Sequence, residues 1–474
     1  MRPFSINRDF YFFGTLLFVL CAAMGLVLGV VHFKIGERVF YLPTFSVWFV
    51  VMVIVNILGL FVLLKYYQHK RYSITFKLGL VYVILLVCHF IVIYTMSSAR
   101  LLEGLFRYTY PLVLISVLLY SISLIFSNAG RRPWLKTAGL FIFVLGSIQL
   151  LSYIWNVNTE NVQVIIALQK VRSWNLLAES LLPIPFLLNF FSEKRKLEMK
   201  NGSPILSNVL KGFLLIAGIA VTTTSFVLIN NSYRFSDNLN NRLERAKVLA
   251  QPFEARTHVG SQGVKIPYRL LKPVDYDPNK AYPLVIGLHH GGGHGTDNAL
   301  QIESSPYAQM LSKNENRKNY PAFIFVPQCL PGFTWGGIPN QPDVATLVFE
   351  AVDELEKEFR IDEKRRYVIG LSMGGYGSWH FISVRPKMFA AAIPICGGGN
   401  PSLAQSIIDV PIWAFHGEKD RSVPVSLSRD MIKAIRDAGG NPQYTEFSSA
   451  GHDIWNQVNS TEGLLDWFFE QKLE

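Results

Sequence analysis

The first 230 residues of the chain are dominated by long apolar stretches, whereas the remainder alternates short apolar runs with polar segments. An apolar stretch of roughly 20 residues is long enough for a helix to cross a bilayer. Seven stretches of this kind predict membrane helices, near Tyr11–Val31, Phe45–Leu64, Leu78–Tyr94, Tyr108–Phe126, Thr137–Ile154, Trp174–Phe191 and Gly212–Ile229. The sixth contains Glu179, Pro183 and Pro185, so we expect it to be kinked or re-entrant.

Basic residues in the loops between these stretches predict their orientation. Lys and Arg are most abundant before the first stretch and in every second loop after it, as in Lys65–Lys77 and Lys194–Lys211. Loops of this kind face the cytoplasm in membrane proteins. Seven crossings then place everything after Ile229 on the opposite face. The prediction is a multi-pass protein of the cell membrane with a cytoplasmic N-terminus and an extracytoplasmic C-terminal half.

The overall composition agrees with a membrane protein. The 474 residues have a mean hydropathy of +0.26 and only 17% charged residues, which is too apolar for a soluble enzyme of this size. The net charge of +11 would suit a nucleic-acid partner, but its concentration in alternate loops explains it by topology. We therefore expect a lipid bilayer as partner and no nucleic acid. The four cysteines are too few for a disulfide framework or a cysteine-based metal site, although Cys329 and Cys396 could pair outside the cell.

Two ionisable residues, His89 and Glu179, lie inside predicted spans. They could line a path for a proton, an ion or a substrate, because charge inside a membrane is costly. We favour hydrogen bonding between helices, because neither residue lies in a run of further polar residues. After the last span, residues 231–252 place apolar residues at near-helical spacing among polar ones and predict a linking helix.

From residue 253 onward the pattern is that of an α/β domain. Short apolar runs separated by helical segments indicate a mainly parallel sheet flanked by helices. About 220 residues of this kind are enough for one domain with a substantial core, here residues 253–474. The eight predicted strands are Phe253–His258, Ile266–Leu271, Leu284–Leu288, Ala322–Val326, Tyr367–Gly370, Ala390–Pro394, Ile412–Phe415 and Tyr444–Phe447.

One of these strands runs directly into Gly370-Leu371-Ser372-Met373-Gly374. This is the G-x-S-x-G pattern of a nucleophile elbow, in which a serine sits at a sharp turn between a strand and a helix. The glycines on either side leave room for the strand and the helix to approach closely. Ser372 is therefore the candidate nucleophile, and it needs a base within hydrogen-bonding reach.

An acid and a base follow in the order that such a serine requires. Asp420 lies on the loop after Ile412–Phe415 and is the preferred acid, with Glu418 as the alternative carboxylate. His452 lies after the last strand and completes the order Ser, Asp, His. The other histidines considered for this role have different expected functions: His380 should pack within the helix after the elbow, and His416 should shape the loop of the acid.

Backbone N–H groups must stabilise the oxyanion that forms when a serine attacks a carbonyl. Met373, directly after the nucleophile, is expected to supply one. The loop His289–Gly295 should supply the other, and Gly291 is the first choice, with His290 or Gly292 as alternatives. The three histidines of this loop could suggest a metal site, but no carboxylate accompanies them at a zinc-enzyme spacing. We therefore expect neither a metal nor another cofactor.

Taken together, these motifs resemble the prolyl-oligopeptidase-like, phospholipase/carboxylesterase branch of the α/β-hydrolases, which includes enzymes like feruloyl esterases and polyhydroxyalkanoate depolymerases. The resemblance rests on Leu288–Asn298, Val326–Cys329 with Trp335, Gly370–Gly377, Ile412–Pro424 and Gly451–Asp453. It implies an esterase- or peptidase-type serine hydrolase with Ser372, Asp420 and His452 as triad. Candidate substrate-binding residues within these motifs are His290, Gln328 and Trp335.

The chain departs from the family pattern at one position. The family usually has His-Gly where this chain has His289-His290, so a side chain occupies a position expected to be bare. The leading hypothesis is a membrane-anchored serine hydrolase that cleaves a small-molecule ester through an acyl-enzyme on the non-cytoplasmic face. A serine peptidase acting on a peptide is the alternative enzyme. A hypothesis of another class is a seven-helix receptor or transporter with an inactive hydrolase-fold binding module.

Overall fold

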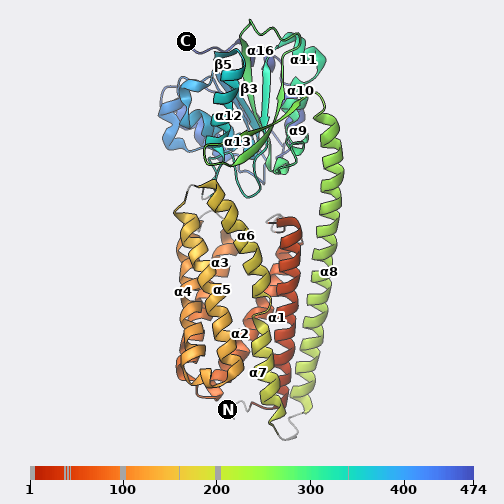
Figure 1. Ribbon diagram of the computed structural model, residues 1–474, viewed down its shortest axis with the longest axis vertical. Helices are drawn as coiled ribbons and strands as arrows, with labels where there is room; N and C mark the ends of the chain where they lie inside the picture. Colours follow the sequence, from red (N-terminus) through yellow and green to blue (C-terminus); the bar gives the residue numbers. More distant parts are fainter. Residues whose placement is uncertain are drawn as a thin grey trace. The chain divides into compact units, whose positions relative to one another are not determined.

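The computed structural model describes residues 6–36, 39, 42, 44–96, 103–159, 161–197, 204–339 and 341–474 (Figure 1). The chain divides into two compact units. The first comprises Met1–Glu160 and Val164–Asp237, and the second comprises Asn161–Gln163 and Asn238–Glu474.

The first unit is built from long helices. Seven helical segments among the described residues are long and apolar enough to cross a membrane, and each contains one of the seven predicted stretches, apart from end residues. The sixth segment consists of two helices, because the chain turns between Glu179 and Pro183, where the prolines cannot continue the backbone hydrogen bonding. The helices are α1 (Arg8–Ile35), α2 (Phe45–His69), α3 (Ser73–Met96), α4 (Glu103–Phe126), α5 (Pro133–Val157), α6 (Val162–Glu179), α7 (Pro183–Arg195) and α8 (Pro204–Leu249), with the short 3-10 helix η3 (Asn128–Arg131) before α5.

The two ionisable residues of the predicted spans, His89 and Glu179, each have a hydrogen-bond partner within this unit. His89 on α3 is hydrogen-bonded to Thr109 on α4 at 2.9 Å, which is the interhelical bond expected from the sequence. Glu179 instead accepts a 2.8 Å hydrogen bond from the Asn175 side chain on its own helix α6, where a bond between helices was predicted.

The second unit contains one eight-stranded sheet in the order β1-β2-β4-β3-β5-β6-β7-β8. The pairs β1–β2 and β2–β4 are antiparallel, and the remaining pairs from β4 to β8 are parallel. All eight predicted strands are present, and the sheet is mixed because of its two antiparallel pairs. The strands are β1 (Glu254–Val259), β2 (Lys265–Leu271), β3 (Tyr282–Leu288), β4 (Phe323–Pro327), β5 (Ile361–Leu371), β6 (Ala391–Ile395), β7 (Trp413–Gly417) and β8 (Gln443–Phe447).

Helices cover this sheet, and its central strands are completely buried. Every residue of β3, β4 and β6 is buried, which is typical of strands covered on both faces. Helix α13 packs across β3, β5 and β6 in the middle of the sheet (Figure 1). The helices of this unit are α9 (Leu300–Glu303), α10 (Pro306–Leu311), α11 (Asn314–Asn319), α12 (Ala345–Glu358), α13 (Met373–Val384), α14 (Ser426–Asp437), α15 (Trp455–Asn459) and α16 (Leu464–Glu470), with 3-10 helices η4 (Gly291–Gly293), η5 (Pro386–Met388) and η6 (Pro401–Ile407).

Helix α8 belongs to both units. It is one unbroken helix from Pro204 to Leu249, and its residues from Asn238 onward are part of the second unit (Figure 1). Ala246 is fully buried in a small apolar cluster with Ala299 and Leu300. The end of the last apolar helix is thus packed into the α/β unit, where the sequence predicted a linking helix over residues 231–252.

Candidate active site

Ser372 lies at the junction of β5 and α13 in a strained backbone conformation. Its φ is 59° and its ψ is −114°, a region that non-glycine residues rarely adopt. Its N–H donates to the carbonyl of Ile395 on the neighbouring strand β6 at 2.8 Å, which fixes the turn from the side. A Cβ on Gly370 would stand 2.1 Å from the carbonyl oxygen of Gly374, so the close approach of strand and helix requires glycine there. The predicted elbow is present.

His452 connects Ser372 to Asp420. It lies on the loop between β8 and α15, with its Nε2 2.8 Å from Ser372 Oγ and its Nδ1 2.6 Å from Asp420 Oδ2. An ionised carboxylate only accepts hydrogen bonds, so Nδ1 carries the hydrogen. Nε2 then has a free lone pair and can accept the hydrogen of the serine hydroxyl.

Asp420 is held as a buried, ionised carboxylate. Its Oδ1 accepts hydrogen bonds from the backbone N–H groups of Ser422 at 2.8 Å and Val423 at 2.9 Å. Burial opposes ionisation, but the hydrogen bonds from His452 and these two N–H groups outweigh it and lower the pKa of Asp420. The alternative acid, Glu418, is exposed and accepts from the N–H of Ser449 instead. The structure therefore brings Asp420, and not Glu418, to the histidine.

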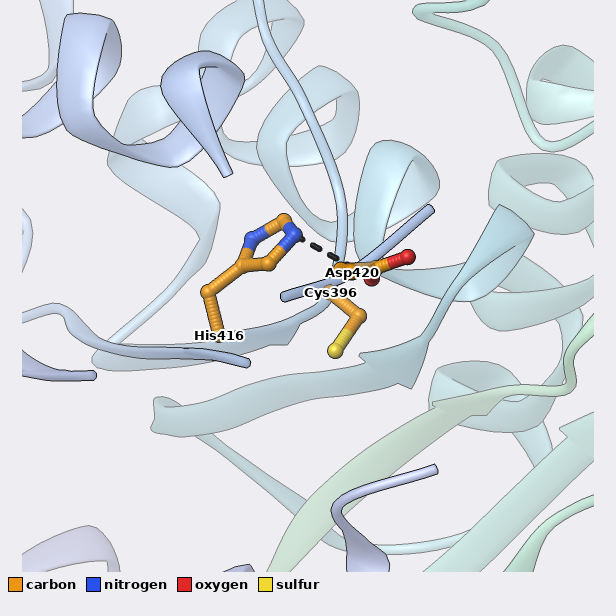
Figure 2. Close-up of side chains that lie close together, drawn as sticks. All are labelled: Cys396, His416 and Asp420. Atoms are coloured by element: carbon orange, nitrogen blue, oxygen red, sulfur yellow. Dashed lines mark ion pairs between the residues drawn. The ribbon is translucent and has the colours of Figure 1, made fainter. Parts of the chain in front are cut away.

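A second histidine contacts the same carboxylate. Cys396, His416 and Asp420 are the only three potential metal ligands that converge in the described part of the chain (Figure 2). His416 Nε2 lies 2.9 Å from the carbonyl oxygen of Val423 and 3.3 Å from Asp420 Oδ2. Both are acceptors, so Nε2 carries a hydrogen and has no lone pair for a metal. Burial raises the pKa of the Cys396 thiol to about 12, which disfavours the thiolate that binds metals. This geometry fits a support for Asp420 better than a metal site.

The four cysteines are all free thiols in the structure. Cys329 and Cys396, which could have paired, are each buried in the α/β unit, and the Cys396 thiol donates to the carbonyl of His452 at 3.5 Å. The loop of the base is thereby tied to the loop after β6.

The loop after β3 has most of its backbone N–H groups engaged. The N–H of His290 donates to the carbonyl of Ser304 at 3.3 Å, and that of Gly293 donates to the carbonyl of His290 at 3.0 Å. The N–H of Gly292 donates to His290 Nδ1 at 3.0 Å. For the exposed Gly291, the described residues provide no acceptor to its N–H.

The N–H of Met373 is also available. Met373 is the first residue of α13, and the first N–H groups of a helix have no intrahelical partner. Gly291 and Met373, the two oxyanion donors expected from the sequence, therefore both have N–H groups that remain available. The alternatives His290 and Gly292 are disfavoured, because their N–H groups are engaged.

The tandem histidines of this loop have different environments. Burial lowers the pKa of His289 well below its ordinary value, and its Nδ1 donates to the carbonyl of His290 at 2.7 Å while its Nε2 accepts from the N–H of Cys329 at 3.0 Å. Burial and then the charge of Arg242 lower the pKa of His290 to about 4. A neutral His290 at neutral pH fits its role as acceptor of the Gly292 N–H. The extra side chain at position 290 therefore folds back onto its own loop.

Gln328 and Trp335, which were candidates for substrate binding, lie beneath this loop with fully buried side chains. Gln328 accepts from the N–H of Asn298 at 2.7 Å and donates to the carbonyl of Gly293 at 3.2 Å. Trp335 Nε1 donates to the carbonyl of His289 at 2.9 Å. In this structure both side chains support the loop.

The sequence gives no indication of a role for Arg242. Its guanidinium group binds Glu303 and the carbonyl of Gly292, which are 61 and 50 positions away in the chain. No motif surrounds it, and a lone arginine in a polar helical segment has no local signal. Arg242 meets these partners only through the packing of the end of α8 inside the second unit.

Comparisons with known proteins find relatives of the C-terminal half. Residues 339–463, which include Ser372, Asp420 and His452, match the dienelactone hydrolase family. A probable feruloyl esterase C of Aspergillus niger is 28% identical over 201 residues, covering 40% of this chain and 69% of that protein. A bifunctional acetylxylan esterase/xylanase of Neocallimastix patriciarum is 28% identical over 207 residues, covering 44% of this chain and 28% of that protein. The crystal structure of a thermostable esterase shares 38% identity at a TM-score of 0.46, covering 48% of this chain and 64% of that one. The chain thus spans less than two thirds of the last two proteins.

Proposed function

We propose that this chain, whose C-terminal half is a serine hydrolase of the α/β-hydrolase superfamily, is a membrane-anchored carboxylesterase that acts outside the cytoplasm. The observation that carries the proposal is the continuous hydrogen-bonded chain from Asp420 through His452 to Ser372. The esterases among its relatives favour an ester as the substrate.

In the proposed reaction, Ser372 Oγ attacks the carbonyl carbon of the ester while His452 Nε2 takes its proton. The N–H groups of Gly291 and Met373 donate to the oxyanion of the tetrahedral intermediate. His452 then returns the proton to the leaving alcohol, and the acyl group remains on Ser372. A water molecule, deprotonated by His452, attacks this acyl-enzyme and releases the carboxylic acid with Ser372 restored.

Asp420 has an electrostatic role in this scheme. It keeps the hydrogen of His452 on Nδ1 and stabilises the imidazolium that forms during each step. His416, Cys396 and the backbone N–H groups around Asp420 hold the carboxylate in place. We assign Gln328 and Trp335 to support of the oxyanion loop, and His290 to the wall of the site beside His452.

The membrane location rests on different support. Among the described residues, seven helical segments have the length and apolar composition to span a bilayer. The concentration of Lys and Arg in alternate loops favours a cytoplasmic N-terminus and an extracytoplasmic hydrolase.

The function is tested on the full chain purified in detergent. The wild type should hydrolyse p-nitrophenyl esters and should be labelled by a fluorophosphonate probe, whereas Ser372→Ala should do neither. Ser383→Ala, a change on the same helix away from the triad, is the matched control and should behave like the wild type. Matched p-nitroanilides separate the enzyme classes, because only the leaving group changes. Faster turnover of the anilides would favour the peptidase alternative, and labelling of Ser372→Ala would refute the assignment of the nucleophile.

A further inference from the structure

The last turns of α8 carry an arginine that reaches the oxyanion loop. Arg242 Nε donates to Glu303 Oε1 at 3.0 Å, and its Nη2 donates to Glu303 Oε2. The two side chains are 22% and 17% exposed, so solvent screens this fork-to-fork pair only in part. Glu303 is the last residue of α9, the short helix that follows the loop after β3.

The same guanidinium group also binds the loop itself. Nη2 donates to the carbonyl of Gly292 at 3.3 Å and to the hydroxyl of Ser304 at 3.0 Å. The carbonyl of Ser304 in turn accepts the N–H of His290 at 3.3 Å. Arg242 thus contacts Gly292 directly and, through Ser304, holds the residue on the other side of Gly291.

The charge of Arg242 has a second effect on this loop. It contributes, after burial, to keeping His290 neutral, and neutral Nδ1 accepts the N–H of Gly292. Protonation of Nδ1 would replace that acceptor with a donor and break the bond. Glu303 and Asp453 oppose this effect, whereas His452 adds to it. The contacts and the charge therefore favour the same arrangement, in which the N–H groups of His290, Gly292 and Gly293 are engaged and the described residues provide no acceptor to that of Gly291.

We propose that Arg242 is a positioning residue that holds the oxyanion loop with the Gly291 N–H directed at the reacting carbonyl. Through it, the end of α8 that belongs to the second unit is a working part of the catalytic site. This inference rests on the proposed function and deepens it. It also predicts that residues 253–474, which contain all three triad residues, are insufficient for full activity, because Arg242 lies before this segment.

The nearby Arg245 provides a matched control. Its Nη2 lies 3.7 Å from the same Glu303, but its side chain is 61% exposed, and Glu303 is its only ion-pair partner in the described part of the chain. Exposed ion pairs of this kind contribute little. Replacing Arg245 removes the same charge from the same helix without touching Gly292 or Ser304.

The test compares Arg242→Met, Arg242→Lys and Arg245→Met in the full chain. Two readouts are used: the rate constant for fluorophosphonate labelling of Ser372, which needs no known substrate, and kcat and KM on an activated ester. Loss of one oxyanion donor typically costs a factor of roughly 100 to 1000, so a misplaced donor should cost about 10- to 100-fold. We expect that loss for Arg242→Met in labelling and kcat, with KM nearly unchanged. Arg242→Lys should be intermediate, because an ammonium group keeps the charge but not the fork.

A transition-state analogue distinguishes positioning from a general structural defect. A trifluoromethyl ketone forms a hemiketal oxyanion with the serine, so its inhibition constant should rise in Arg242→Met by the factor by which kcat/KM falls. A wild-type labelling rate in folded Arg242→Met, or equal losses in Arg242→Met and Arg245→Met, would overturn the proposal. If the wild type is labelled but hydrolyses no ester, the proposed function fails and the labelling rates still decide the role of Arg242. Absence of labelling in the wild type would overturn both.

Discussion

The carbonyl oxygen of Leu288 occupies the place where a side chain on Gly374 would begin, since a Cβ there would stand 1.8 Å from it. Leu288 ends β3, and Gly374 lies in the first turn of α13. The end of β3, from which the loop His289–Gly295 leaves, and the start of α13 are therefore in direct backbone contact. This contact fixes the start of the loop that carries Gly291 against the start of the helix that carries Met373.

Gly374→Ala should disrupt this contact. A methyl group cannot be accommodated against a backbone carbonyl without moving the loop or the helix, so kcat should fall by roughly 100-fold or more, as for loss of an oxyanion donor. Gly218→Ala is the control, because a Cβ at Gly218 would have no neighbour within 4 Å. The measurement is kcat on an activated ester together with the melting temperature. Wild-type kcat in Gly374→Ala would contradict the described geometry.

Asp420→Asn should leave the fold intact and remove most of the activity. The amide is nearly isosteric but uncharged, so it neither fixes the hydrogen on His452 Nδ1 nor stabilises the imidazolium. In serine hydrolases with this arrangement the loss in kcat is on the order of 10⁴-fold. Glu418→Gln, the same change of charge on the same loop, should retain nearly full activity. Comparable losses in the two variants would argue that Asp420 is not the acid.

The stability of the α/β unit should depend on pH through His290. Its pKa is about 4 in the folded state, held down by burial and Arg242, while Glu303 and Asp453 oppose this and His452 adds to it. An unfolded histidine has a pKa of about 6.5. Between these values the unfolded chain binds more protons, so the free energy of unfolding should fall as the pH falls from about 6.5 to 4.

His290→Gln should flatten this dependence. The readout is the midpoint of denaturant unfolding of the α/β unit, measured at several pH values in the window. His69→Gln, at an exposed position of the first unit, serves as the control and should leave the dependence unchanged. An unaltered slope in His290→Gln would show that His290 is protonated in the folded state.

The proposed orientation can be tested with single cysteines in a background without the four native ones. A cysteine replacing Lys196, after α7, should be shielded from a membrane-impermeant maleimide in intact cells, because that loop is proposed to be cytoplasmic. A cysteine replacing the exposed Lys265 on β2 should react readily. Permeabilised cells should label both positions. The reverse pattern in intact cells would place the hydrolase in the cytoplasm.

Local patterns in the sequence were sufficient for the elements and for the order of the triad. Apolar length identified the seven long segments, and short apolar runs identified all eight strands, because these features depend on the spacing of neighbouring residues. The elbow was equally visible, since its steric demands fall on glycines two positions from Ser372. The antiparallel direction of β1 and β2 was not, because direction depends on the loops that bring strands together.

Only the tertiary structure decided which side chains meet at the site. Ser372 and Asp420 reach His452 from 80 and 32 positions away, and the choice of Asp420 over Glu418 rests on which carboxylate of one loop contacts the histidine. The fully buried positions of Gln328 and Trp335 beneath the loop His289–Gly295 could not be predicted from the sequence. The role of Arg242 depends on tertiary structure for the same reason, because its partner Glu303 is 61 positions away and the two side chains meet only in the folded second unit. Periodicity and local sterics act over a few residues, whereas the contacts that position a reacting group are made between segments far apart in the chain.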